Sequence, residues 1–211
     1  MKRLFSVVCL VLLAACSPVA PAATPAARVD VYATAATLSW LNEAFICAAQ
    51  GGVTLNILSN PADADIALRI GEPDTLTTPA FQIDTEEILI AASRESPLQA
   101  LTLKRVRDLF AGRGDLSAQV WVYPSDADSQ KVFDQLVMNG RSVTSFARMA
   151  ASPREMSAAL NKESNALGIL PRHWLIGSLR EIYSVGTVPV LAVVKAEPQG
   201  AVKTLIACLQ K

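Results

Sequence analysis

Residues 87–113 decide the fold, and they read EILIAASRESPLQALTLKRVRDLFAGR. The stretch opens with apolar and small residues typical of a buried strand, which ends before Pro97. Thr102 is a good N-cap for a helix over residues 103–110, and Gly112 ends that helix. A strand, a turn and a capped helix in direct succession favour a chain in which strands alternate with helices.

The same alternation continues in both directions, which predicts an α/β body with much parallel strand pairing. In the helix expected over residues 37–49, Leu38, Leu41 and Phe45 share one apolar stripe. Strands are expected over residues 29–34, 53–58, 64–70, 81–93 (two pieces around 84–86), 118–123, 166–170, 181–185 and 188–194. Helices are expected over residues 37–49, 103–110, 153–162, 198–209 and from the turn 124–129 to about 139.

The composition excludes several classes of protein. Of 211 residues, 51% are hydrophobic and 18% are charged, which is typical of a folded body and not of a disordered chain, a collagen or a coiled coil. The 19 basic and 19 acidic residues cancel to a net charge of zero. Nucleic-acid binding usually needs a basic face, so we expect no nucleic-acid partner.

The N-terminus has the features of an export signal. A short basic start, Lys2 and Arg3, precedes an apolar run over residues 4–15 that is too short to span a bilayer. The run ends in Leu-Ala-Ala-Cys16, which resembles the lipobox of bacterial lipoproteins. The resemblance implies that residues 1–16 are a lipoprotein signal and that Cys16 carries lipid such as palmitate. It also implies an extracytoplasmic protein anchored to the bacterial membrane. An ordinary signal peptide with a chance cysteine is the alternative.

Residues 17–28 are rich in proline and alanine. Three prolines among small residues favour an extended segment that packs poorly, which suits a tether between a lipid anchor and a folded body. The body is therefore expected over residues 29–211.

The sequence lacks the usual signatures of catalysis. His173 is the single histidine, and no nucleophile motif lies near it, so a packed or solvated ring is expected there. The four cysteines are far apart, and no glycine-rich phosphate loop occurs. We expect no enzyme activity, no metal and no cofactor.

Residues 87–113 are similar to the hinge region of phosphate-type periplasmic substrate-binding proteins. The likeness rests on Ser96-Pro97-Leu98, on Leu101-Thr102 and on Phe110-Ala111-Gly112. The strand over 166–170 and the Val188-Pro189-Val190 segment look like later parts of the same family. The resemblance implies an α/β, two-lobed periplasmic-binding-protein-like (type II) fold with two crossover strands. Lobe I is then expected over residues 29–92 plus 186–211, and lobe II over 93–185.

In that family, ligands lie between the lobes, and helix N-termini supply the anion sites. Two turns of this chain match such positions by the resemblance. The expected contacts are Thr34, Ala35 and Thr37 on lobe I, and Ser125, Asp126 and Ser129 on lobe II. The alternative is that these residues are only helix caps.

Two departures argue against carrying over a phosphate specificity. Asp126 and Asp128 occupy the second turn, where they would repel an anion. The loop over residues 59–63 is short, whereas family members usually place a helix and a further anion-binding turn there.

The resemblance therefore implies a lipid-anchored, monomeric solute-binding protein that delivers a small molecule or ion to a membrane permease of an ABC-type transporter. The alternative is a binding-protein-like lipoprotein with a degenerate cleft, acting as a structural or signalling partner outside transport.

A disulfide between Cys47 and Cys208 is expected on the same basis. Removal of the signal takes away Cys9, and lipid occupies Cys16, so two cysteines remain in an exported body. In the family, the terminal helix returns to pack on the first lobe, which would bring the helices of Cys47 and Cys208 together. Two separately buried thiols are the alternative.

Overall fold

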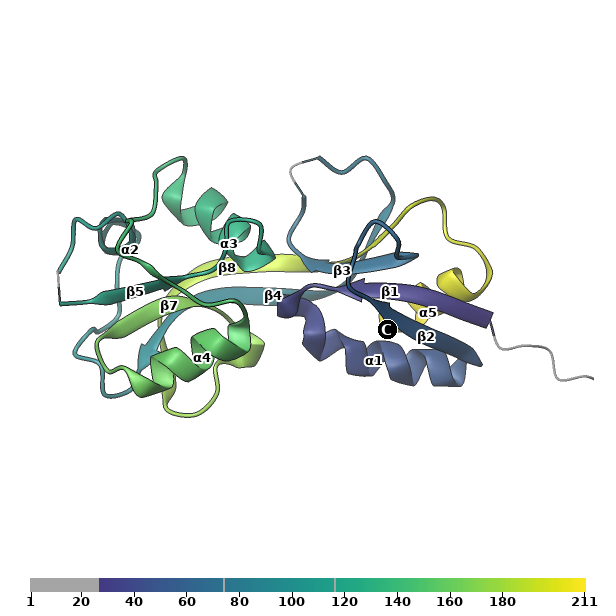
Figure 1. The fold of residues 1–211 in the computed structure, drawn as a ribbon, viewed down its shortest axis with the longest axis horizontal. Coiled ribbons are helices and arrows are strands. Elements are labelled where there is room, and N and C mark those ends of the chain that lie inside the picture. Colours follow the sequence, from purple (N-terminus) through teal and green to yellow (C-terminus); the bar gives the residue numbers. More distant parts are fainter. Residues whose placement is uncertain (1–26, 74, 116) are drawn as a thin grey trace, which may run out of the picture.

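The computed structural model describes residues 27–73, 75–115 and 117–211, so the expected signal, Cys16 and most of the tether lie outside the described part. One sheet of eight strands runs through the molecule in the order β2-β1-β3-β8-β4-β7-β5-β6 (Figure 1). The strands are β1 (Ala27–Ala33), β2 (Val53–Leu58), β3 (Ile66–Ile70), β4 (Ala80–Ser93), β5 (Gln119–Val122), β6 (Arg148–Met149), β7 (Ala166–Pro171) and β8 (Leu179–Val194).

Helices cover both faces of this sheet, and in Figure 1 α3 lies above it while α1 and α4 lie below it. None of the helices in the described ranges has the length and apolar character needed to cross a membrane. The α-helices are α1 (Leu38–Gln50), α2 (Leu103–Phe110), α3 (Asp128–Phe133), α4 (Pro153–Lys162) and α5 (Gly200–Leu209). The shorter turns are the 3-10 helices η1 (Ala35–Thr37) and η3 (Arg172–Trp174) and the π-helix η2 (Asp134–Met138).

Two long antiparallel strands, β4 and β8, join the two lobes. The first half of β4 and the last half of β8 lie in lobe I, where β8 also pairs with β3. The second half of β4 lies in lobe II, between β7 and the first half of β8. Lobe I contains β1, β2, β3, α1 and α5, whereas lobe II contains α2, α3, α4, β5, β6 and β7. The two-lobed α/β architecture with two crossover strands is therefore confirmed. The expected lobe bounds stay a prediction.

The expected breaks in these two strands were wrong, because each strand is continuous. β4 passes without interruption through residues 84–86, and β8 passes through Gly186 and Pro189. The polar residues of β4 find partners where the strand crosses between lobes. Asp84 accepts a hydrogen bond from the Trp40 indole, and Glu86 lies against His173. Register shifts between Gln82 and Asp84, and again after Ile88, absorb the irregularity as bulges.

The apolar stripe of α1 does not form the buried face of that helix. Leu38 and Phe45 are 46% and 47% exposed, whereas Trp40, Ala44 and Cys47 are buried. Apart from Trp40, the buried residues of this helix are small, and α1 contacts α5 through the Cys47–Cys208 disulfide. The Cα atoms of the two cysteines are 5.7 Å apart, which fits the geometry of a bridge.

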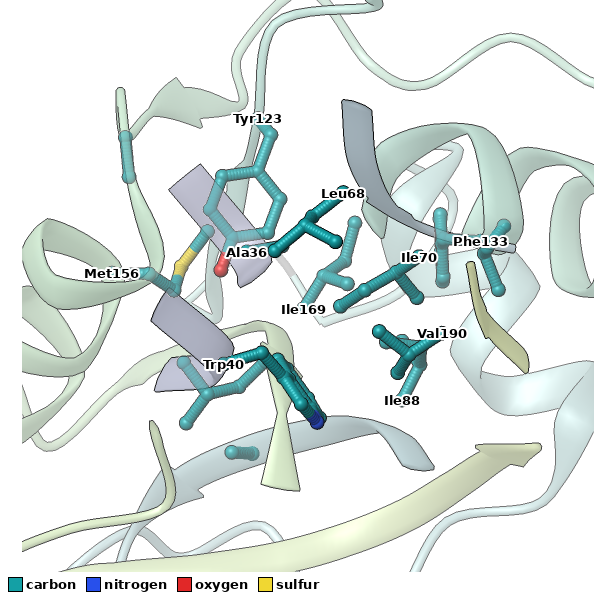
Figure 2. Packing of buried hydrophobic residues seen from close by; sticks show 14 of the residues in the cluster. Ala36, Trp40, Leu68, Ile70, Ile88, Tyr123, Phe133, Met156, Ile169 and Val190 are labelled. Carbon is teal, nitrogen blue, oxygen red and sulfur yellow. The ribbon is translucent and has the colours of Figure 1, made fainter. Parts of the chain in front are cut away.

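The buried side chains form one cluster that extends through both lobes. Figure 2 shows how side chains of the two lobes meet around the crossover strands, which contribute Ile88 and Val190. Tyr123, Phe133 and Met156 come from lobe II, and Ala36, Leu68 and Ile70 from lobe I. The two lobes therefore share one hydrophobic core at their junction.

Candidate ligand-binding cleft

The site lies where strands of the two lobes end facing each other. β1 leads into η1 through Thr34, and β5 leads into α3 through the turn over residues 124–127. Both connections follow the carboxyl end of a parallel strand, which is where α/β sheets bind ligands. A cavity of about 260 Å³ opens between them. Lobe I lines it with Tyr32 and residues 34–36, and lobe II with residues 123–124, 126–129 and 151–153.

Four of the six predicted contact residues line this cavity: Thr34, Ala35, Asp126 and Ser129. Thr37 instead lies buried beneath it, where its hydroxyl donates to the carbonyl oxygens of Leu68 and Thr34. Ser125 lines a separate hollow on the surface of lobe II. Successive side chains of a helical turn point in different directions, so a residue beside the lining residues can face away from the cavity.

Two buried hydroxyl groups in the cavity wall have no hydrogen-bond partner within the described chain. They belong to Tyr123 and Ser129, which are 3% and 2% exposed. In Figure 2 the hydroxyl end of Tyr123 extends from lobe II to the side of Ala36 in lobe I, and both residues line the cavity. Burial raises the pKa of Tyr123 well above 10, so the hydroxyl is neutral and can both donate and accept.

The two acidic residues of the second turn have different roles. Asp126 is exposed, lines the cavity and has no ion-pair partner among the described residues. Asp128 is buried, and its carboxylate lies 3.0 Å from Arg69 Nη2 while accepting the backbone N–H of Ile70 at 3.0 Å. Our expectation that Asp128 repels an anion is therefore wrong, because the Arg69 guanidinium of the other lobe compensates its charge.

A third helix start reaches the cavity, and sequence reasoning did not assign it there. Ser152 and Pro153 begin α4 and line the lobe II wall. The Ser152 hydroxyl accepts from Glu155 N at 3.2 Å, and the Glu155 carboxylate accepts from Ala151 N at 2.8 Å. This reciprocal capping box is visible in the sequence, but its position beside the cleft depends on the tertiary fold. Tyr123 was missed for the same reason, although it ends the predicted strand before the Pro124 turn.

His173 belongs to a contact at the junction of the lobes. Its Nδ1 lies 2.5 Å from the buried Glu86 carboxylate, and its ring contacts Trp40 with centroids 4.7 Å apart. Trp40 belongs to α1 of lobe I and His173 to η3 beside β7 of lobe II, so this contact bridges the lobes. Within the described ranges, no group of three or more metal-ligating side chains comes together.

No family model matches this chain, and no curated protein matches it in sequence. Solved structures match it over most of its length. A putative phosphate ABC transporter substrate-binding protein with bound phosphate from Clostridium perfringens aligns with a TM-score of 0.77 and 14% identity. The alignment covers 86% of this chain and 92% of that chain. This chain has the periplasmic-binding-protein fold.

The periplasmic-binding-protein fold serves more than one kind of protein. An ABC-type phosphate transport receptor from Vibrio cholerae aligns with a TM-score of 0.64 and 15% identity, covering 87% of this chain and 93% of that chain. The CcmR regulatory domain of Synechocystis PCC6803, in complex with 2-PG, also gives a TM-score of 0.64, with 11% identity and coverage of 87% and 96%. At such low identity the likeness establishes the fold, and the ligand must be argued from the cleft itself.

Proposed function

We propose that this protein is a lipid-anchored, extracytoplasmic solute-binding protein that holds a small ligand between its lobes and delivers it to an ABC-type transporter. One observation carries the proposal. Two residues that line the cavity between the lobes, Tyr123 and Ser129, carry buried hydroxyls that have no partner in the described chain.

The physical reason is the free energy of a buried polar group. A buried hydroxyl without a hydrogen bond costs about 1 to 3 kcal/mol, and native structures contain few of them. A bound solute that hydrogen-bonds to Tyr123 and Ser129 removes this cost for both groups. The cavity of about 260 Å³ is near the small end of ordinary ligand pockets, so we expect a small solute.

The transport and anchoring parts of the proposal rest on other features. The solved structures from Clostridium perfringens and Vibrio cholerae are named for phosphate transport, which favours a transporter partner for the same fold here. The lipobox-like end at Cys16 and the proline-rich segment after it favour a body tethered to the membrane.

A thermal-shift screen of the purified protein against anions, amines, amino acids and sugars tests the binding function. A solute bound only by the native state raises the melting temperature, and the stabilisation grows with the logarithm of its concentration relative to the dissociation constant. Tyr123→Phe and Ser129→Ala should leave the unliganded melting temperature unchanged or raise it, because each removes an unsatisfied group. Both variants should reduce the shift caused by the ligand. If a hydroxyl has a purely structural role, its removal should lower the unliganded melting temperature and leave the ligand-induced shift unchanged.

One observation favours the alternative, a structural or signalling partner outside transport. Arg69 and Asp128 hold the lobes together without any ligand. If no solute in the screen shifts the melting temperature, and both hydroxyl variants behave like the wild type, the cleft is not a binding site and this alternative replaces the proposal.

A further inference from the structure

The cleft has two sides of opposite electrostatic character. From this polarity we propose that the ligand is a small zwitterion, a solute of the α-amino-acid class. Its carboxylate faces the helix start of lobe I and its ammonium group faces Asp126 of lobe II. This inference rests on the proposed solute-binding function and specifies the ligand of the same cavity.

The lobe I side offers uncompensated helix N-terminal N–H groups. Neither Thr34 nor Thr37 caps the helix start with its side chain, and the first turns of η1 and α1 contain no acidic residue. α1 has 13 residues, so its aligned peptide dipoles place partial positive charge at this end. Ala35 and Ala36 present this end to the cavity. An anionic group of the ligand is therefore favoured on this side.

The lobe II side is acidic. The start of α4 has few free donors, because Pro153 has no N–H and the Glu155 N–H donates to the Ser152 hydroxyl. The Glu155 carboxylate also accepts from Ala151 N, just before the helix. Glu155 thereby places a negative charge where a free helix start would attract an anion. Asp128 is neutralised by Arg69, which leaves the exposed carboxylate of Asp126 without a compensating charge in the cavity wall. A cationic group of the ligand is favoured here.

The residues described around the cavity exclude simpler ligands on charge. The wall contains no lysine, arginine or histidine in the described ranges, so a multiply charged anion such as phosphate would meet Asp126 with only helix N–H groups to compensate it. A simple amine would leave the helix start of lobe I unused. A zwitterion places an opposite charge against each side of the cleft, so both of its charged groups find compensation when they leave water.

The two buried hydroxyls complete the match. Tyr123 and Ser129 can each donate to the ligand carboxylate or accept from its ammonium group, since a hydroxyl has one donor and two acceptor positions. The small cavity restricts the ligand to few atoms beyond the two charged groups.

Isothermal titration calorimetry on the full chain tests the inference with glycine, L-alanine, L-serine, acetate, methylammonium and inorganic phosphate. At least one of the three amino acids should bind at least about ten-fold more tightly than each of the other three compounds, a difference of about 1.4 kcal/mol. Asp126→Asn should weaken the binding of that amino acid at least about ten-fold. Glu197→Gln also replaces a carboxylate by an amide, at an exposed residue before α5, and it should leave the affinity for that amino acid unaltered.

Three outcomes overturn the inference. One is tighter binding of phosphate than of any amino acid. Another is unchanged amino-acid affinity in Asp126→Asn. The third is no binding by the amino acids. If phosphate binds most tightly and Tyr123→Phe weakens phosphate binding, the cleft still binds a solute and only the amino-acid specificity is wrong. The two failures are therefore distinguishable. After the third outcome, the wider thermal-shift screen decides whether the cleft binds another solute.

Discussion

Arg69 of lobe I and Asp128 of lobe II form an ion pair across the cleft, with Nη2 and Oδ1 3.0 Å apart. The Asp128 side chain is 3% exposed and that of Arg69 is 24% exposed, so the pair is poorly screened by water. The second carboxylate oxygen accepts the backbone N–H of Ile70, which ties the first turn of α3 to the end of β3. An ion pair and a hydrogen bond therefore connect the lobes before any ligand binds.

Asp128→Asn should lower the free energy of unfolding by about 2 to 4 kcal/mol. The change keeps the shape of the side chain but leaves the Arg69 guanidinium partly buried without a counter-charge, which is more costly than the loss of an exposed pair. Urea unfolding followed by circular dichroism measures the difference. Small-angle scattering should also show a larger radius of gyration, because the ion pair between the lobes is lost.

Asp108→Asn is the matched control for this variant. Asp108 pairs with Lys104 within α2, but the Lys104 side chain is 87% exposed. Exposed pairs contribute about 0 to 1 kcal/mol, so this variant should stay close to the wild type. Equal losses of unfolding free energy in the two variants would show that the ion pair between the lobes contributes no more than an exposed pair.

Tyr123 should make the protein sensitive to high pH. Burial raises its folded-state pKa well above the ordinary value of 10.0, whereas the unfolded chain loses the proton near that value. Below about pH 10 the Tyr123 hydroxyl is neutral in the folded and the unfolded protein, so its ionisation does not change the free energy of unfolding. As the pH rises above about 10, ionisation of the unfolded chain draws the equilibrium towards unfolding.

The free energy of unfolding of the wild type should therefore fall between about pH 9 and pH 11. In Tyr123→Phe it should fall by about 1 kcal/mol less, since one titrating group is gone. Urea unfolding at several pH values gives both curves. Parallel curves would show that Tyr123 ionises as freely in the folded protein as in the unfolded chain.

The disulfide should stabilise the body strongly, because Cys47 and Cys208 are separated by 161 positions in the chain. Closing so long a loop stabilises a fold by about 4 to 5 kcal/mol in the chain-entropy model, although measured values are often smaller. Cys208→Ala should lower the melting temperature, and reduction of the wild type should lower it by a similar amount. Free thiols at both positions in unfolded, unreduced protein would show that the bridge does not form.

The alternation of strands and helices predicted the α/β class, and the resemblance to periplasmic substrate-binding proteins implied the two lobes with crossover strands. The N-cap Thr102 and the capping box of Ser152 and Glu155 define their helices as expected, and both hydroxyls accept the predicted backbone bonds. Bulges could not be predicted, because the polar residues around Asp84 and the glycine at 186 look like breaks until the long pairing of β4 with β8 is known. The buried face of α1 depends in the same way on α5, which lies far along the chain.

The candidate site was predicted only in part. Thr34, Ala35, Asp126 and Ser129 line the cavity, and they were implied by the resemblance to periplasmic substrate-binding proteins, whose ligands lie at helix starts. Tyr123 follows the end of β5, and the lack of a partner for its hydroxyl among the described residues depends on the tertiary fold. Arg69 lies on an expected strand, and its pairing with Asp128 across 59 positions leaves no local trace.

Cys16 should carry lipid at the N-terminus of the mature protein. Mass spectrometry of protein extracted from membranes should find acylated Cys16 as the first residue, because the apolar run before it ends in small residues. Cys16→Ser should move the protein into the soluble fraction. Cys9→Ser, inside the apolar run, is the control and should remain in the membrane fraction. Unchanged membrane retention of Cys16→Ser would contradict the lipid anchor.

If a small solute binds in the cavity between the lobes, a side chain that fills this cavity should abolish binding. Ala35 is exposed and lines the cavity, so Ala35→Trp should fill the cavity without disturbing the core. Ala62→Trp adds the same side chain to an exposed loop outside the cavity. The measurement is the dissociation constant, by calorimetry, of the solute that most raises the wild-type melting temperature. We expect a loss of at least about 100-fold in Ala35→Trp and none in Ala62→Trp. Equal affinity in the two variants would show that the solute binds outside the cleft.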